Sequence, residues 1–572
     1  MHDAARSSSS TRLLGKASGR YSPGIAAAIA FLVYVPSIAY TWVFDDVPQI
    51  VENFRLTNGR FVPAYFSEHL WAHMLPAQYA NYYRPVFLLW LRLNYALFGT
   101  AHAWPWHITA ILLHVVATYL VVLLAREITQ SHLQASTSET DSTAVTAALL
   151  FAVHPSHVEA VAWISGASET LFACFCIGAL TVYLRWRKSQ SSRYLLGLAL
   201  LTAGTLLSKE SGMTLVIILM AWELLPSSSP MPASLRWKGI TVVALLTAAY
   251  VPLRIEVLHG WSHVPQNGTL HDMLRTVPQA LAFYLRHLLV AMPYGFYGYS
   301  LLRHFDAMFW ASLLFVLLIT ACLLIAAKHV PFGRAALVII FVPLIPVLVA
   351  TTSFISRDLV HDRYLYVPSA GLCILIAGLL SDHARKKHFV GALALGWTIM
   401  LVLAEPQWRS DATLYAASVQ HQPGSSFART LWAGELIRQG RSQEAVAQYE
   451  QAIALDPQAA RAYSNFAEWE VHSGDCSKAL PLLQRSIALD PRSGEQHYLL
   501  AYCELRTGDA PDAIVAAQQT LALTPKALGV YPLIGDAEMR LGKTAAARAA
   551  YVEEMRRDPQ NTALRKMLDR LP

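Results

Sequence analysis

Long apolar runs alternate with short polar loops over the first 404 residues of this chain. A helix needs about 20 apolar residues to cross the hydrocarbon core of a bilayer. The pattern predicts eleven spans, near 24–44, 103–126, 143–157, 164–184, 194–208, 212–226, 239–257, 307–327, 335–352, 364–381 and 388–404. Two shorter apolar stretches, 85–99 and 276–292, are each interrupted by an arginine (Arg92 and Arg286), which favours interfacial helices. The sequence therefore predicts an all-α fold.

After residue 404 the chain becomes polar and periodic. Three residue types recur in one 34-residue step: Pro at 423, 457, 491, 525 and 559, Gly at 440, 474, 508 and 542, and Ala at 445, 479, 513 and 547. Glycine separates two helices, alanine lets them pack closely and proline ends the second helix, which is the tetratricopeptide pattern. We expect a linker over 405–425 and a repeat domain over 426–572, with four repeats and the capping helix TALRKMLDRLP.

The composition and the placement of charge support a membrane protein. Hydrophobic residues make up 54% of the chain and charged residues 15%, whereas soluble domains carry about 25% charged residues. The net charge of +7 is modest and the basic residues flank apolar runs, which favours membrane orientation over binding to nucleic acid. The positive-inside rule then predicts a basic cytoplasmic N-terminus over 1–23, a membrane domain over 24–404, and repeats on the outer side, in the periplasm or ER lumen.

Ionisable residues, which are costly at membrane depth, gather in the loops of the predicted outer face. Asp45 and Asp46 end the first span, and later loops contain NYYRP, HPSHVEAVAWISGASE, SKESG and SRDLVHDRYLYVPS. This mixture of acids and cations suits a lipid-phosphate-linked sugar, because such a donor presents an anion at the level of the membrane headgroups. We expect the partners to be such a donor, membrane lipid and the hydroxyl of a protein or glycan acceptor, which the repeat domain could hold.

Each residue type in these loops has a role in that chemistry. Asp45 or Asp46 could take the proton from the attacking hydroxyl. The cations that could hold the donor phosphate are Arg84, Lys209 and Arg363. The side chains that could line the substrate site are Tyr82, Tyr83, His154, His157, Glu159, Glu210, Asp362, Tyr364 and Tyr366.

Structural interpretations stay open for several of these residues. The aspartate pair could cap the next helix, and Lys209 could pair with the adjacent glutamate in a tight turn. His154 and His157 could ligate a metal with Glu159, although a hydrogen-bonded structural role fits one short segment better. The six cysteines have no zinc or haem spacing, so we expect no dedicated metal centre, and a divalent cation as cofactor stays open.

The motifs FDDVPQIVEN, YYRPVFLLWLRLNYALFG, HPSHVEAVAWISGASETL, LSKESGMTL and DRYLYVPSAG occur in this order ahead of the repeats. Together they resemble the transmembrane and tetratricopeptide-repeat O-mannosyltransferase family of the GT-C glycosyltransferase superfold, over about 24–561. The resemblance implies an inverting enzyme that moves mannose or a similar sugar from a polyprenyl-phosphate carrier to a protein Ser or Thr hydroxyl. It also implies that the essential acid follows span 1, at Asp45 or Asp46.

The chain departs from that family in two ways. Its array of four repeats is short, and the segment SGASE lacks the basic residue expected before the acid, which weakens any role for Glu169. Low lysine and high alanine content indicate a bacterial relative, in which the enzyme would lie in the inner membrane with periplasmic repeats and an undecaprenyl-phosphate sugar as donor.

Three other functions are compatible with parts of the pattern. Oligosaccharide ligases or polymerases of the O-antigen type also carry such repeats, but they usually place catalysis in a long late outer loop, and the corresponding loop here, 353–363, is short. A non-catalytic scaffold with membrane-tethered repeats would need only one or two spans. A transporter would be expected to show charged residues within spans and a pair of broken helices. This sequence has few charged residues within its predicted spans and no corresponding pair of broken helices.

The repeat region contains two cysteines, Cys476 and Cys503. Cys476 begins the second helix of repeat two, and Cys503 lies late in the first helix of repeat three. These two helix ends should be neighbours in a stack of repeats. An oxidising compartment would allow a disulfide if the two Cα atoms lie within about 7 Å; the alternative is two buried thiols that never meet.

Overall fold

The computed structural model describes residues 23–74, 80–132, 137–225, 233–261, 269–290, 292, 295–297, 304–350, 360–380 and 386–569. These residues form helices and turns and contain no strand, so the predicted all-α fold is confirmed. The chain divides into two compact units, unit 1 (Met1–Ala417) and unit 2 (Ser418–Pro572), which are described separately.

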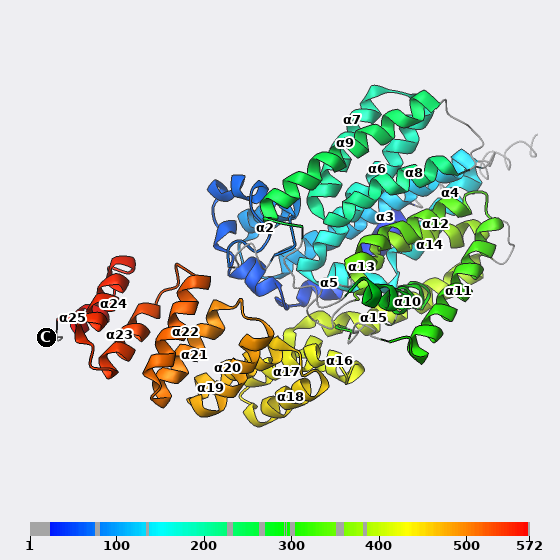
Figure 1. Ribbon diagram of the computed structural model, residues 1–572. Coiled ribbons are helices and arrows are strands. Elements are labelled where there is room, and N and C mark those ends of the chain that lie inside the picture. The colour runs from blue at the N-terminus through cyan, green and yellow to red at the C-terminus, as the bar shows by residue number, and fades with distance from the viewer. Residues whose placement is uncertain are drawn as a thin grey trace, which may run out of the picture. The chain divides into compact units, whose positions relative to one another are not determined.

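The helices of unit 1 follow the predicted order of apolar runs (Figure 1). They are the segment Pro23–Ala39, α2 (Pro85–Phe98), α3 (Trp104–His132), α4 (Thr137–Ala152), α5 (Val158–Ala162), α6 (Ala167–Ser189), α7 (Ser192–Ser208), α8 (Thr214–Leu224), α9 (Ala233–Leu258), α10 (Leu270–Leu289), α11 (Ala307–Lys328), α12 (Gly333–Phe341), α13 (Ile345–Ala350), α14 (Tyr366–Leu379) and α15 (Lys386–Ala404). A further helix, α16 (Asp411–His421), begins in unit 1 and ends in unit 2. In this bundle α3 packs against α4 and α6, and α14 packs against α4 and α12. Gly371 permits the last contact, because a β-carbon there would lie 2.7 Å from the Ala336 carbonyl oxygen of α12.

Only some of these helices are long and apolar enough to cross a membrane alone. Five of the described helices meet both conditions: Trp104–Ser131, Ile164–Ser189, Trp237–Leu258, Ala307–Lys328 and His388–Arg409. A pair bent by 54°, Thr137–Ala152 with Pro155–Ala162, adds a sixth if it forms one span. A helix lies at each of the eleven predicted positions, but α8 has 11 residues and extends only about 16 Å. The count of eleven spans therefore stays a prediction.

The two stretches predicted as interfacial are both helical. The first, α2, begins and ends close to the predicted bounds. The second, α10, begins at Leu270, six residues earlier than predicted, because Thr269 and Asp272 form a reciprocal capping box. That local signal marks the start of the helix, whereas the apolar run begins only in its second turn.

Several helices of unit 1 present large apolar side chains on their outer surface. On α11 these exposed side chains are Met308, Trp310, Leu314, Leu317, Leu318, Leu324 and Ile325, and on α15 they are Phe389, Leu395, Ile399, Val402 and Leu403. Water-exposed surfaces rarely carry apolar patches of this extent, whereas lipid-facing helices do. The exposed side chains and the long apolar helices together indicate that unit 1 is a membrane domain.

Most of the segment expected to be a linker, 405–425, is helical. It contains a short 3-10 helix, Glu405–Arg409, and then α16. Trp408, Leu414 and Tyr415 are all buried. The Trp408 ring stacks on the Trp163 ring with centroids 5.7 Å apart. Apolar side chains thus hold much of this segment in place.

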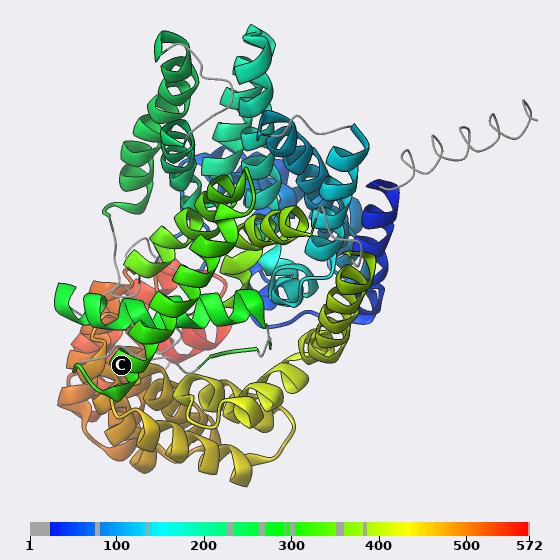
Figure 2. The same ribbon diagram turned by 90° about the vertical axis from the view of Figure 1, so that its right-hand side faces the viewer.

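Unit 2 is a row of helix pairs that follow one another in chain order, coloured from yellow to red in Figure 1. In Figure 2 the yellow helices of this unit face the viewer. The pairs are α17 (Ser426–Arg438) with α18 (Ser442–Leu455), α19 (Ala460–Ser473) with α20 (Cys476–Leu489), α21 (Gly494–Thr507) with α22 (Ala510–Leu523), and α23 (Val530–Arg540) with α24 (Thr544–Arg557), followed by α25 (Thr562–Leu568). The repeated glycines have φ between +74° and +105°, and the repeated alanines are at most 1% exposed. The predicted repeats are confirmed, and each residue type has the role its period indicated.

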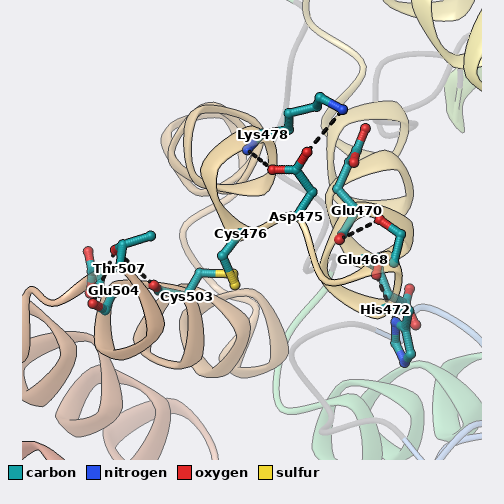
Figure 3. Close-up of a disulfide and its surroundings, with 10 residues drawn as sticks. Glu468, Glu470, His472, Asp475, Cys476, Lys478, Cys503, Glu504 and Thr507 are labelled. Carbon is teal, nitrogen blue, oxygen red and sulfur yellow. Dashed lines mark hydrogen bonds and ion pairs between the residues drawn. A yellow bond between two sulfur atoms is a disulfide. The ribbon is translucent and has the colours of Figure 1, made fainter.

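A disulfide joins Cys476, the first residue of α20, to Cys503, late in α21 (Figure 3). The two Cα atoms are 5.0 Å apart, within the limit expected from the sequence. Both residues are buried between the second and third repeats. Asp475 caps α20 beside the bond by accepting a hydrogen bond from the Lys478 amide at 3.1 Å.

We expect alkylation of the denatured, unreduced protein to modify four of its six cysteines. The four are Cys174, Cys176, Cys322 and Cys373, which the structure leaves as thiols. Mass spectrometry should show six modified cysteines after reduction. Replacing both bonded cysteines by serine should lower the free energy of unfolding of unit 2 by about 3.5 kcal/mol, as estimated for a loop closed over a sequence separation of 27 residues. Modification of all six cysteines without reduction would exclude the bond.

Candidate active site

Asp46 ties the loop after the first helical segment to the turn that precedes α6. It is fully buried, and its Oδ1 accepts hydrogen bonds from the Ser165 amide (2.8 Å) and hydroxyl (2.6 Å). Its Oδ2 accepts one from the Val43 amide at 3.1 Å. Burial raises the pKa of Asp46 to about 7, although these hydrogen bonds oppose the rise. With both oxygens engaged, this acid holds the loop in position.

Asp45 precedes Asp46 in the chain but lies in a more open environment, where part of its surface is exposed. Its charge acts on the hydroxyl of Tyr82. The pKa of Tyr82 is raised mainly by burial, and four charges also act on it: Arg84 and Arg363 lower it, whereas Glu210 and Asp45 raise it. Charges from four separate segments therefore converge on one tyrosine.

Arg84 binds Glu210 through a bidentate ion pair. Its Nε and Nη2 donate to the two carboxylate oxygens at 3.1 and 2.7 Å, and its Nη1 donates to the Ser168 hydroxyl at 3.3 Å. The guanidinium also lies over the Tyr82 ring, 4.6 Å from its centroid. Although burial raises the pKa of Glu210, Arg84 holds it at about 2, so this pair is fully charged at neutral pH.

Lys209 forms an ion pair with Glu169, in the first turn of α6. The side chains are only 3% and 4% exposed, so little water screens the pair. The Lys209 ammonium also lies 4.3 Å from the centroid of the Tyr364 ring. The local pair between Lys209 and Glu210, one interpretation of the sequence, is therefore not what the structure shows: each residue pairs with a partner from a distant segment.

Arg363 pairs with Glu159 in two ways. Its guanidinium forms an ion pair with one carboxylate oxygen, and its backbone amide donates to the other at 3.0 Å. His361 approaches the same carboxylate at 3.2 Å. The guanidinium contacts the rings of Trp163 and Tyr364, with its central carbon 5.5 and 5.0 Å from their centroids. Glu159 was predicted to contact substrate, but these contacts favour a role in holding Arg363.

The Asp362 carboxylate contacts one residue of α10 and one residue that follows α10 in the chain. Its Oδ1 lies 2.7 Å from Nδ1 of His287, and its Oδ2 accepts a hydrogen bond from the Tyr297 hydroxyl. It is 1% exposed. These contacts fix the turn that carries Arg363 and favour a supporting role for Asp362.

Four other predicted substrate contacts are buried and bonded within the protein. The Tyr83 hydroxyl donates to the Phe66 carbonyl oxygen (2.9 Å), and the Tyr366 hydroxyl lies 2.6 Å from Nδ1 of His114. The ring of His157 contacts the Ser369 hydroxyl (2.7 Å), and that of His154 contacts the Leu288 carbonyl oxygen (3.0 Å). These hydrogen bonds favour the structural interpretation of the two histidines that the sequence left open.

Sequence reasoning missed several residues that shape the site. Glu169 received little weight because the basic residue expected before it was absent, yet it neutralises Lys209. The Ser165 hydroxyl donates a hydrogen bond to Asp46, and the Ser168 hydroxyl accepts one from Arg84. The motif SGASE contains all three residues, and its unusual density of short polar side chains just before an apolar run was the available signal.

The arrangement combines anion-binding groups with an accessible acid. Arg84, Arg363, Tyr82, Tyr364, Glu210 and Asp45 all retain some exposed surface. An arginine has five N–H donors, so it can keep a carboxylate partner and still bind a phosphate. Among the described residues no group of three or more His, Cys, Asp or Glu could hold a metal ion. The described arginines therefore offer cationic groups to an anionic substrate.

Comparison with known proteins matches both units. A family model described as "Dolichyl-phosphate-mannose-protein mannosyltransferase" matches residues 83–253, and two tetratricopeptide models match 435–468 and 470–527. The chain is 25% identical over 460 residues to "Protein O-mannosyl-transferase F38B6.6" of Caenorhabditis elegans, covering 77% of this chain and 64% of that protein. It is 26% identical to human "Protein O-mannosyl-transferase TMTC4", covering 70% and 61%. The chain is a homologue of the transmembrane and tetratricopeptide-repeat O-mannosyltransferases.

The similarity to these O-mannosyltransferases covers only part of each relative. With "Protein O-mannosyl-transferase Tmtc2" of Drosophila melanogaster the identity is 32%, over 40% of this chain and 24% of that protein. The chain spans less than two thirds of the length of each of these three relatives. The mannosyltransferase match includes Arg84 and Lys209, whereas Asp45, Asp46 and Arg363 lie outside it. Among solved structures, MamA aligns with 26% of this chain and 88% of its own at 20% identity, with a TM-score of 0.25.

Proposed function

We propose that unit 1 is a GT-C-type inverting glycosyltransferase that moves a mannose-like sugar from a polyprenyl-phosphate carrier to a protein Ser or Thr hydroxyl. One observation carries the proposal: Arg84 lies over the Tyr82 ring, Arg363 lies over the Tyr364 ring, and the charges of Arg363 and the partly exposed Asp45 also act on Tyr82. The homologues named as protein O-mannosyltransferases support the reaction class. The acids and cations provide the two functions that such a transfer needs, a proton acceptor and a phosphate site.

Asp45 is the proposed general base. Its carboxylate accepts the proton of the acceptor hydroxyl as that oxygen attacks the anomeric carbon of the sugar. The bond between the anomeric carbon and the phosphate oxygen breaks, and its electron pair leaves with the polyprenyl phosphate. Attack from the side opposite the leaving group inverts the configuration at the anomeric carbon. Asp46 would hold the loop and would not touch substrate.

Arg84 and Arg363 are the proposed phosphate ligands. Both side chains are partly exposed, at 13% and 17%, whereas Lys209 is 3% exposed and bound to Glu169. The arginines would contact the phosphate oxygens, and Lys209 would act through its charge and its contact with Tyr364. Tyr82 and Tyr364 lie beside the arginines and are the proposed contacts of the sugar or the headgroup region.

The proposed location is the inner membrane of a bacterium, with the N-terminus in the cytoplasm and unit 2 in the periplasm. The disulfide of unit 2 supports an oxidising compartment for that unit, because cytosolic thiols are kept reduced. The repeats would then be exposed to exported proteins, and the acceptor of the membrane domain would be one of these proteins.

The proposal is tested by incubating the purified full chain with radiolabelled polyprenyl-phosphate sugars and membrane extract. We expect label to move from mannosyl phosphopolyprenol to protein, and mild base to release it by elimination from Ser or Thr. Transfer to lipid-linked glycan with no label in protein would instead support an oligosaccharide ligase. Absence of transfer from every donor would exclude the glycosyltransferase.

Replacing Arg84 by Lys should raise the KM for the donor by about tenfold or more. Lysine keeps the charge but loses the fork that engages Glu210 and the donor phosphate together, and a hydrogen bond to a charged group contributes about 1.5–3 kcal/mol. Donor titration of initial rates measures the effect. Arg60, an exposed arginine in the first loop, is the matched control, and Arg60→Lys should leave the KM unchanged. An unchanged KM in Arg84→Lys would remove Arg84 from the phosphate site.

A further inference from the structure

The segment that precedes the repeats is bonded to the loop that carries Asp45. The Thr41 amide and hydroxyl both donate to the carbonyl oxygen of Arg409, each at 3.1 Å. The Phe44 amide donates to Oδ1 of Asp411, the first residue of α16, at 2.7 Å. Two residues far along the chain thus bind the backbone immediately before the candidate base.

Phe44 has a backbone conformation that its residue type rarely adopts. Its φ is +53°, and among the described residues only Gln190 and His259 are other non-glycine residues with positive φ. A left-handed conformation costs about 1–2 kcal/mol for a residue with a β-carbon, so the surroundings must maintain it. The Phe44 ring packs against Phe296 and Trp163, with centroids 5.0 and 5.9 Å away. Because Asp45 follows directly, the Phe44 backbone sets the direction of its side chain.

The contact with Phe44 is not explained by capping of α16. Ser410 and Thr413 cap that helix: the Thr413 hydroxyl accepts from the Ser410 amide at 3.0 Å, and the Ser410 hydroxyl accepts from the Thr413 amide at 3.3 Å. The capping role is therefore filled by other residues, and the Asp411 carboxylate reaches out of its own helix to the backbone of the loop.

We propose that Asp411 is a positioning residue that holds Phe44 in its left-handed conformation and thereby orients Asp45 toward the acceptor hydroxyl. The role of Asp45 rests on the proposed function, whereas the contact with Phe44 does not. The carboxylate acts through the backbone and takes no part in the proton transfer. The segment expected to be only a linker to the repeats thus contributes to the geometry of the site.

The first test compares Asp411→Ala with Asp411→Asn. The alanine variant lacks the acceptor, so its kcat should fall by about tenfold or more, as expected for loss of a hydrogen bond to a charged group. The KM for the donor should stay within about twofold, because the phosphate site is not altered. Asparagine retains an oxygen at this position and should keep most of the wild-type kcat. Asp306→Ala, which removes an exposed aspartate that caps α11, should leave kcat unchanged.

The second test measures the role of the conformation itself. Phe44→Ala and Phe44→Gly both remove the ring, but only glycine adopts positive φ without cost. Adding Asp411→Ala should lower kcat by about tenfold in the alanine background and by less than about threefold in the glycine background. An equal loss in both backgrounds, or no loss in Asp411→Ala alone, would overturn the proposal.

Amide hydrogen exchange separates this proposal from the proposed function. Loss of the acceptor should speed exchange at the Phe44 amide in Asp411→Ala, without a change in the repeats. The exchange measurement requires no sugar transfer. An inactive wild-type protein would therefore refute the proposed glycosyltransferase, while the exchange rate would still test the hydrogen bond between the Phe44 amide and Asp411. Unchanged exchange at Phe44 would refute the contact even in an active enzyme.

Discussion

Sugar transfer should fall by about 10² or more when Asp45 is replaced by Asn, because the amide has the shape of the acid but cannot accept the proton. The side chain is partly exposed, and the amide has nearly the same volume as the acid, so the variant should fold. Initial rates at saturating donor and acceptor measure the loss. Wild-type rates in this variant would exclude Asp45 as the base.

Two further variants distinguish the acid at 45 from its neighbours. Glu52→Gln changes an exposed acid in the same loop and should leave transfer unchanged. Asp46→Asn should act mainly through stability, because its new amide group would face one of the donors that the carboxylate accepts. A buried donor left unpaired costs about 1–3 kcal/mol, so the thermal midpoint should fall in Asp46→Asn and stay constant in Asp45→Asn.

Replacing Lys209 by Met should lower the free energy of unfolding of unit 1 by about 3–5 kcal/mol. The substitution leaves Glu169 charged, buried and without its cation, and uncompensated buried charge is strongly destabilising. Thermal unfolding in detergent, followed by tryptophan fluorescence, measures the change. A midpoint equal to that of the wild type would show that the pair contributes nothing to stability.

The double variant Lys209→Met, Glu169→Met removes both charges of the same ion pair. Apolar pairs often replace buried ion pairs without loss of stability, so the midpoint should recover. Sugar transfer should not recover if the Lys209 charge acts on the donor phosphate. Arg441→Met breaks an exposed pair with Glu444 in unit 2 and should leave the midpoint unchanged.

The periodic parts of the fold could be predicted from the sequence, because each depends on local spacing. The 34-residue step fixed the repeat helices, and apolar runs located the helices of unit 1. Helix length was harder to predict, and α8 and α14 are shorter than the predicted spans. A short 3-10 helix with its own hydrogen bonds precedes each of them and includes residues that the apolar pattern predicts to lie in the span.

The pairing of charges in the site could not be predicted in the same way. Arg84 and Glu210 are 126 residues apart, and Arg363 and Glu159 are 204 apart. No spacing rule connects such residues, because their meeting depends on how the helices pack. The sequence indicated which loops carry charge, and only the fold shows that each predicted phosphate ligand already has a carboxylate partner. The role of Asp411 was hidden for the same reason.

Those carboxylate partners bear on how quickly the enzyme could turn over. Sugar transfer converts a phosphodiester, with one negative charge, into a phosphomonoester that carries nearly two at neutral pH. Three bare cations would bind the spent carrier more tightly than the incoming donor and so slow its departure. Glu210, Glu169 and Glu159 offset the three positive charges before any lipid arrives. In the proposed reaction the paired site would thus orient the donor phosphate while limiting product inhibition by the more highly charged carrier.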